Sequence, residues 1–298
     1  MKWQGVIPAL TTPFAEDLSV DHGFLAHHAD VLVRAGCTGI VALGSLGESA
    51  TLTFDEKVAI LKTLRRALGS RASLVAGIAA LSTAEACGLA REAAAAGCEG
   101  LMVLPPYVYR GDDRETGAHF SAVFSATPLA CMLYNNPIAY GTDVVPERIA
   151  ALWERHPNLT AVKESSADIR RVTELKALVG GRLALLVGVD DLIVEGLAAG
   201  AVGWIAGLVN ALPVESVRLF DLASAGKRTE AERLYEWFLP LLRLDTVPKF
   251  VQLIKLAQQE AGLGSERVRP PRLVLEGAER TAAIRLIRDR LSNRLAPR

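Results

Sequence analysis

The sequence has no excess of charge of either sign and no long apolar run. Its 33 Lys and Arg residues balance 33 Asp and Glu residues, whereas binding to nucleic acid or to an anionic membrane surface depends on clustered basic charge. No apolar stretch approaches the ~20 residues of a membrane span. The apolar runs at the N-terminus are short and broken by Pro8 and Pro13, unlike a signal peptide. We therefore expect a cytoplasmic protein with no nucleic-acid or membrane partner.

Cysteine, histidine and glycine lack the spacings that mark disulfide, metal and nucleotide sites. The four cysteines are scattered without a CxxC pair, which favours reduced thiols over a disulfide framework. The five histidines form no HxH or HExxH pattern, and the turn GSLGE at 44–48 does not have the GxGxxG spacing. The sequence thus predicts no metal and no nucleotide cofactor.

A short apolar run followed by an amphipathic helical pattern recurs eight times in the first 225 residues. Runs that are apolar on both faces are typical of parallel strands covered by helices. Eight such units predict an α/β fold of the (β/α)8 TIM-barrel type, with an open doubly wound sheet as the structural alternative. The apolar runs occupy residues 5–10, 39–44, 73–78, 100–105, 129–135, 159–165, 183–189 and 202–207.

Three further helical patterns follow the eighth unit, at 229–242, 247–261 and 277–293. No stretch with the composition of a linker separates them from the barrel. We therefore expect the barrel to occupy residues 1–226 and a C-terminal helical extension, packed on the barrel, to occupy residues 227–298.

Lys163 is the first candidate for chemistry, because the active site of such a barrel lies at the C-terminal ends of its strands. It stands near the end of the sixth apolar run, where a lysine is expensive to desolvate. A neutral lysine amine is the nucleophile of Schiff-base chemistry. The alternatives are an ion pair with Glu164 or a side chain that extends to the barrel rim.

Two tyrosines and one turn are candidates for the rest of the site. Tyr134 ends the fifth run, where a phenol can relay a proton, although an ordinary core tyrosine is the alternative. Tyr107, after the fourth run, is a second candidate for the relay, and Tyr109 competes for the same role. The GSLGE turn offers backbone N–H groups and a serine hydroxyl to a carboxylate, but an ordinary βα turn has a similar composition.

Two aspartates, Asp190 and Asp191, follow the seventh run where the next helix begins. Short acidic side chains at a helix N-terminus commonly accept its free backbone N–H groups. We interpret the two residues as an N-cap pair, with an acid–base role as the alternative.

Taken together, these motifs resemble the dihydrodipicolinate synthase/N-acetylneuraminate lyase family of class I, Schiff-base-forming barrels. The resemblance covers nearly the whole chain, and the order and spacing of the motifs are more specific than any one of them. The motifs are GVIPALTTPF, GSLGESATLTFDEK, PPY, LYNNP, VKES, VGVDD and GWIAG.

The resemblance implies a role for each candidate residue. Lys163 would form the Schiff base, Tyr134 would relay protons, and Tyr107 would reach into the site of a neighbouring subunit. The family is commonly a tetramer built from two dimers, so a homo-oligomer is expected. The substrate-binding residues implied are Ser45, the backbone N–H of Leu46, Gly47 and the backbone near Ile205.

Two departures from the family pattern suggest the substrate. The synthases of the family usually have a hydroxyl residue where this chain has Leu46, and an arginine for a second carboxylate where it has Ala139. The combination of GSLGE, YNNPIAYG and KESS resembles the 1-pyrroline-4-hydroxy-2-carboxylate deaminases of hydroxyproline catabolism. We therefore expect a Schiff-base lyase and deaminase that releases ammonia and 2-oxoglutarate semialdehyde, with no cofactor.

Three alternatives remain open. One is a 2-keto-3-deoxy sugar-acid aldolase or dehydratase that uses the same lysine. Another is 4-hydroxy-tetrahydrodipicolinate synthase, with Arg110 or Arg114 as a substitute anion site. The third, from another class, is a catalytically silent barrel that senses a metabolite.

Overall fold

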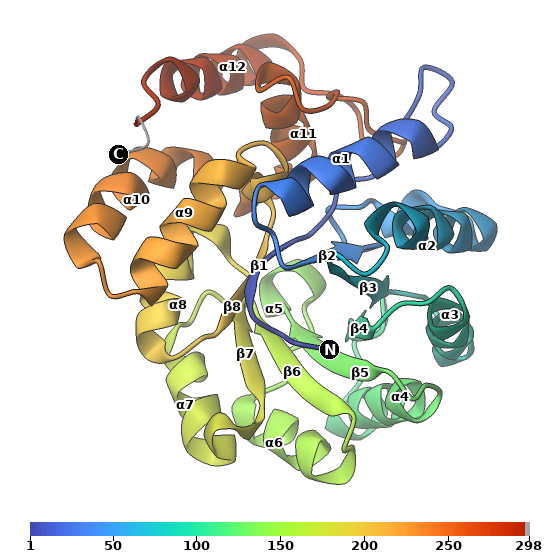
Figure 1. Ribbon diagram of the computed structural model, residues 1–298. Coiled ribbons are helices and arrows are strands. Elements are labelled where there is room, and N and C mark those ends of the chain that lie inside the picture. The colour runs from blue at the N-terminus through green and yellow to red at the C-terminus, as the bar shows by residue number, and fades with distance from the viewer. Residues whose placement is uncertain (296–298) are drawn as a thin grey trace.

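Parallel strands form the inner wall of a barrel, and helices surround them (Figure 1). Within residues 1–295, the part of the chain that this computed structural model describes, eight strands lie in the order β1-β8-β7-β6-β5-β4-β3-β2. The predicted (β/α)8 barrel is confirmed, and the open-sheet alternative is wrong. The strands are β1 (Gly5–Pro8), β2 (Gly39–Ala42), β3 (Ser73–Ile78), β4 (Gly100–Val103), β5 (Ala130–Asn135), β6 (Leu159–Glu164), β7 (Ala184–Val187) and β8 (Gly203–Ala206).

The barrel closes where β1 lies between β8 and β2. β1 pairs with β8 along its whole length, with Gly5 opposite Gly203. On the other side, Leu10 N donates to Val41 O at 2.8 Å and a single bridge joins Ala9 to Val41. Closure therefore places the C-terminal ends of all eight strands around one mouth.

Helices follow the strands in alternation and cover the outside of the barrel. The amphipathic patterns predicted most of them to within two residues. The α-helices of the described residues are α1 (His22–Arg34), α2 (Phe54–Leu68), α3 (Thr83–Ala95), α4 (Asp113–Ser125), α5 (Pro137–Tyr140), α6 (Pro146–Arg155), α7 (Arg170–Val179), α8 (Ile193–Ala199), α9 (Pro213–Ser224), α10 (Arg228–Leu242), α11 (Phe250–Glu260) and α12 (Gly277–Ser292).

Several strands are shorter than the apolar runs that predicted them. The run 39–44 ends as a strand at Ala42, because Leu43 turns into a left-handed conformation with φ 63°. The buried residues beyond these strand ends line the connections to the following helices. Apolar character thus extends past the hydrogen-bonded ladder at the mouth of the barrel.

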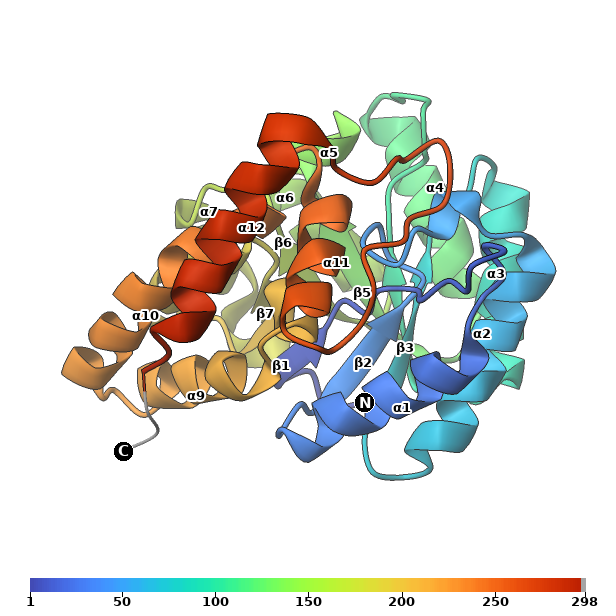
Figure 2. The same ribbon diagram turned by 90° about the horizontal axis from the view of Figure 1, so that it is seen from above.

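The last three helices pack against the barrel and against each other. α10 lies beside α9, and α12 lies beside both α10 and α11, as Figure 2 shows. The C-terminal helical extension is confirmed as part of the fold, whereas a domain boundary at residue 226 stays a prediction. In residues 1–295, no helix has the length and apolar composition needed to cross a membrane.

A buried ion pair joins the C-terminal helices to the turn at 44–48. Glu48 Oε1 lies 2.7 Å from Lys255 Nζ of α11, and the two side chains are 0% and 2% exposed. Lys255 also donates to Thr12 O at 2.8 Å, and Arg269 N donates to Glu48 Oε2 at 3.0 Å. Because Glu48 holds a left-handed φ of 54°, these contacts fix a turn that its backbone does not prefer.

We predict that Lys255→Met destabilises the protein by about 3–5 kcal/mol, because it leaves the Glu48 carboxylate buried without its cation. Urea denaturation measures the loss of unfolding free energy. The control is Lys249→Met, which breaks the exposed ion pair with Glu279 and should cost less than about 1 kcal/mol. Equal effects of the two substitutions would show that the buried pair does not anchor the helices.

Candidate functional site

Lys163 lies in β6 with its side chain inside the barrel, only 6% exposed. It pairs in register with Tyr134 of β5, and its Nζ lies 4.0 Å from the centroid of the Tyr134 ring. A glycine beyond the end of β7 leaves room for it, since a Cβ on Gly188 would lie 2.5 Å from Lys163 Cε. The amine therefore stays inside the barrel rather than extending to its rim.

Glu164, the next residue, faces a different set of partners. Its carboxylate accepts hydrogen bonds from Ser166 N at 2.6 Å and from Asn135 Nδ2 at 3.2 Å. Successive residues of a strand point to opposite faces, so Lys163 and Glu164 face away from each other. The alternative of a Lys163–Glu164 ion pair is therefore wrong, and burial raises the pKa of Glu164.

Three tyrosines meet above the lysine, and one of them was not predicted from the sequence. Tyr140, the last residue of α5, packs edge-on against Tyr134 with ring centroids 5.8 Å apart and against Tyr107 with centroids 5.3 Å apart. Its hydroxyl also forms a hydrogen bond with Ser45 Oγ. The side-chain amide of Asn136 donates to Tyr134 Oη at 3.0 Å. Tyr140 thus connects the two predicted relay tyrosines to the turn.

Burial raises the pKa of two phenols of this cluster, those of Tyr140 and Tyr107. Desolvation, and then the neighbouring Tyr134 and Tyr107, raise the pKa of Tyr140 well above its usual range. Desolvation also raises the pKa of Tyr107. The hydrogen bonds of Tyr107 with Ser45 and Tyr140 lower this pKa and so oppose the shift. Neutral phenols can pass protons along a hydrogen-bonded chain while none of them carries a charge in the barrel.

Tyr107, and not Tyr109, lies in this cluster. The Tyr109 side chain is 58% exposed and its hydroxyl donates to the Glu115 carboxylate at 3.1 Å. The resemblance implied that Tyr107 serves a neighbouring subunit, but its ring lies against Tyr140 of the same chain. A role of Tyr107 in a neighbouring subunit stays a prediction.

The predicted carboxylate-binding turn lies at the same mouth. Ser45 faces the tyrosines, whereas the Leu46 side chain is buried at 3% exposure. Gly47 O accepts a hydrogen bond from Thr12 Oγ1 at 2.7 Å, which holds the turn against the segment after β1. Ile205 is buried in β8 opposite Ile7. The structure brings Ser45 to the site, and substrate binding by these residues stays a prediction.

Asp190 is not an N-cap residue, which corrects that interpretation. It is fully buried and accepts hydrogen bonds from Trp204 Nε1 at 2.9 Å, Gly207 N at 3.1 Å and Leu208 N at 2.7 Å. These donors come from β8 and the segment after it, while α8 begins without a side-chain cap. Burial raises the pKa of Asp190 to about 6, and the three N–H groups oppose that shift.

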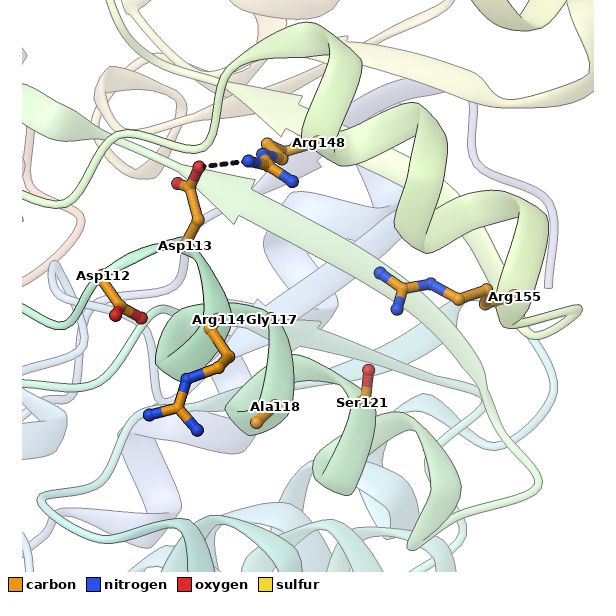
Figure 3. Close-up of a pocket in the computed structure, with 8 residues that line it drawn as sticks. All are labelled: Asp112, Asp113, Arg114, Gly117, Ala118, Ser121, Arg148 and Arg155. Carbon is orange, nitrogen blue, oxygen red and sulfur yellow. Dashed lines mark ion pairs between the residues drawn. The ribbon is translucent and has the colours of Figure 1, made fainter.

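The two arginines proposed as substitute anion sites lie in different places. Arg110 packs against the C-terminal end of α5, where a Cβ on Gly141 would lie 2.4 Å from its Cζ. Arg114 is one of the residues that line a surface groove of about 760 Å³ at α4 and α6, and Arg148 and Arg155 are two others (Figure 3). Arg110 therefore lies beside Gly141 at the end of α5, whereas Arg114 belongs to the outer helical layer.

The ionisable groups at the mouth are a lysine, three tyrosines and several carboxyl groups. Lys163 and Tyr134 lie in contact, and the Asp190 carboxylate lies beyond β7. Across residues 1–295, no group of three or more His, Cys, Asp or Glu side chains is arranged to hold a metal ion. These side chains can therefore supply a nucleophile and several proton donors at one place.

A lysine inside a parallel barrel, with tyrosines at its amine, defines the class of Schiff-base-forming barrels. The model of the Dihydrodipicolinate synthetase family matches residues 2–290. The chain belongs to this family, whose lyases are class I Schiff-base enzymes.

Individual relatives agree with this assignment. The chain is 35% identical over 239 residues to 4-hydroxy-tetrahydrodipicolinate synthase of Prochlorococcus marinus, covering 80% of this chain and 79% of the relative. The solved 4-hydroxy-tetrahydrodipicolinate synthase of Methylacidiphilum fumariolicum SolV superposes with a TM-score of 0.93 at 29% identity, covering 98% and 97% of the two chains. YagE of E. coli K12, solved in complex with pyruvate, gives 0.91 at 26% identity, covering 97% and 98%.

We predict that Tyr140→Phe lowers kcat by ~10²-fold or more, because it removes a hydroxyl that hydrogen-bonds with Ser45 at the centre of the tyrosine cluster. Steady-state kinetics with the substrate that the wild type turns over fastest measures the effect. Tyr109→Phe is the matched control on an exposed tyrosine and should change kcat by less than threefold. A comparably small effect of Tyr140→Phe would place the relay elsewhere.

Proposed function

We propose that the protein forms a Schiff base between Lys163 and a small 2-oxo or 2-imino acid. The observation that carries this proposal is the burial of the Lys163 amine inside the barrel, 4.0 Å from the Tyr134 ring. A buried amine beside neutral phenols suits attack on a carbonyl or imine carbon, because protons can leave and return without bulk water. Membership of the family supports the same chemistry.

The residues at the mouth of the barrel have different roles in the first half-reaction. The turn with Ser45 and the Leu46 N–H holds the substrate carboxylate. Lys163 attacks C2, the C2 oxygen or ring nitrogen is expelled, and a protonated imine forms. This imine withdraws electrons, so a proton at C3 is lost and an enamine results. Tyr134, Tyr140 and Tyr107 carry the protons of these steps.

For the second half-reaction, the relatives favour condensation of pyruvate with aspartate semialdehyde. The similar proteins from Prochlorococcus and Methylacidiphilum are named 4-hydroxy-tetrahydrodipicolinate synthase, and the YagE structure contains pyruvate. The second carboxylate of such a substrate needs a cation, and Arg110 beside the end of α5 supplies one. This alternative is therefore the first candidate for the specific reaction.

Deamination of 1-pyrroline-4-hydroxy-2-carboxylate is the second candidate. It needs one carboxylate site and no second clamp, which agrees with Ala139 and with the buried Leu46. The names of the relatives do not support this branch of the family, so it rests on Ala139, Leu46 and the resemblance of the GSLGE, YNNPIAYG and KESS motifs. Assembly as a tetramer of two dimers and a cytoplasmic location also stay predictions.

We predict that borohydride reduction in the presence of pyruvate labels Lys163 covalently. The buried amine is positioned for imine formation, and mass mapping of the peptide identifies the site. Lys163→Arg should abolish both labelling and turnover, because a guanidinium stays protonated and cannot attack. A label on another lysine would contradict the assignment.

We predict that a substrate panel shows condensation of pyruvate with aspartate semialdehyde at a kcat/KM at least ten times that of any other reaction. The panel includes ammonia release from the hydroxylated pyrroline and cleavage of keto-deoxy acids. Arg110→Ala should raise KM for the semialdehyde about tenfold, since a charged hydrogen bond contributes about 1.5–3 kcal/mol. Ammonia release as the dominant reaction would instead identify the deaminase.

A further inference from the structure

Asp245 brings a carboxyl group from the C-terminal helices to the mouth of the barrel. It ends the short 3-10 helix η5 (Arg243–Asp245), between α10 and α11, and is half-buried. Its carboxylate lies directly against Gly207 at the end of β8, where a Cβ would come within 2.1 Å of Asp245 Oδ1. Gly207 has an ordinary φ of −90°, so space for this carboxyl, and not backbone freedom, requires the glycine.

The two neighbouring carboxyl groups at this point have unequal partners. Asp190 accepts three N–H hydrogen bonds, which favour its charged form. Within residues 1–295, no hydrogen bond or ion pair forms to the Asp245 carboxyl. Burial, and then the Asp190 carboxylate, raise the pKa of Asp245 well above its usual range, while Lys163 opposes the shift. The charge is therefore better stabilised on Asp190, and Asp245 is the group that more readily holds a proton.

The surroundings of Asp245 place it in the same site as the lysine. Lys163 Cε packs against Gly188, two residues before Asp190, and Gly207 both donates to Asp190 and lies against Asp245. Asp191 also faces the pair, but it is compensated by Arg243, whose Nε lies 3.3 Å from its carboxylate. A carboxyl group that readily holds a proton, at the same end of the barrel as a Schiff-base lysine, has the attributes of a general acid.

We propose that Asp245 is the acid that protonates a substrate oxygen in the second half of the reaction, after Lys163 has formed the enamine. The inference rests on the Schiff-base function proposed above and adds to it a residue from outside the barrel strands. The tyrosine cluster and Asp245 would then serve opposite ends of the bound molecule.

The step balances for either candidate reaction. In the condensation, C3 of the enamine bonds to the aldehyde carbon, the carbonyl π pair moves to oxygen, and that oxygen takes the proton of Asp245. In the deamination, the C4–O bond breaks with its electron pair, the oxygen takes the same proton and leaves as water, and the enamine nitrogen restores its C=N bond. In both, Asp245 becomes a carboxylate and regains a proton from water.

The test separates enamine formation from the later step. Wild type and Asp245→Asn are compared in three measurements: borohydride trapping with pyruvate, exchange of the pyruvate methyl protons in D2O, and turnover of the panel substrate that the wild type uses. We expect trapping and exchange to stay within threefold and kcat to fall ~10²-fold or more. Asp191→Asn is the matched control and should leave all three within threefold.

Each other outcome overturns a defined claim. Turnover of Asp245→Asn within threefold of wild type would overturn the inference. Loss of exchange together with turnover would also overturn it, because Asp245 would then support the lysine and not the later oxygen. Failure of borohydride to trap an adduct of the wild type with either pyruvate or the hydroxylated pyrroline would overturn the Schiff-base proposal itself.

A second variant tests the position of the carboxyl without changing its chemistry. Gly207→Ala places a methyl group against Asp245 and should lower kcat at least tenfold in the wild-type background. In an Asp245→Ala background the same substitution should lower kcat less than threefold, because the clash is gone. Equal effects in both backgrounds would show that Gly207 acts independently of Asp245, against the proposal.

Discussion

The buried pair of Glu48 and Lys255 is the constraint on which the site depends. It fixes the turn after β2 to a helix of the C-terminal extension, with both charges removed from water. A buried charge that loses its partner is expensive, so the turn and α11 keep their relative positions. Ser45, three residues before Glu48, is thereby held where it meets Tyr140. The helices outside the barrel are thus part of the architecture of its mouth.

The mouth has two chemically different sides. Around Tyr134 and Tyr140, phenols pack edge-on against one another and over the lysine. On the opposite side, the Asp245 carboxyl group occupies the space beside Gly207 after β8, and Asp190 accepts hydrogen bonds from Gly207 and Leu208. A lysine between neutral donors and acidic groups has proton donors of different strength within reach. Such an arrangement suits a reaction that must both remove and return protons.

Candidate residues that lie at the end of a single predicted strand could be identified from the sequence. Lys163 and Tyr134 stand at strand ends, and the alternation of runs and helices located both. Tyr140 was missed because a four-residue helix, without a periodic signal, turns it back onto the cluster. Asp190 was misinterpreted because its donors come from β8, and Asp245 was missed because it follows the barrel by a long interval of sequence. Contacts between distant segments are invisible to local patterns.

The substrate was harder to infer than the fold. This chain has Ala139 where the synthases of the family usually have an arginine. Arg110, from the loop after β4, nevertheless lies beside the end of α5, the helix that contains Ala139. The absence of an arginine at one sequence position therefore does not establish that no arginine lies at that place in the structure. The known relatives favour the synthase interpretation, for which such a replacement cation is required.

The pairing of β1 with β8 has a consequence for when the barrel can fold during synthesis. Gly5 lies opposite Gly203, so β1, which is made before the other seven strands of the barrel, has no partner on that side until β8 has been made. During synthesis the unpaired backbone N–H and C=O groups of this edge are open to other chains and to chaperones, as is usual when distant segments must meet. The barrel can close only late in translation.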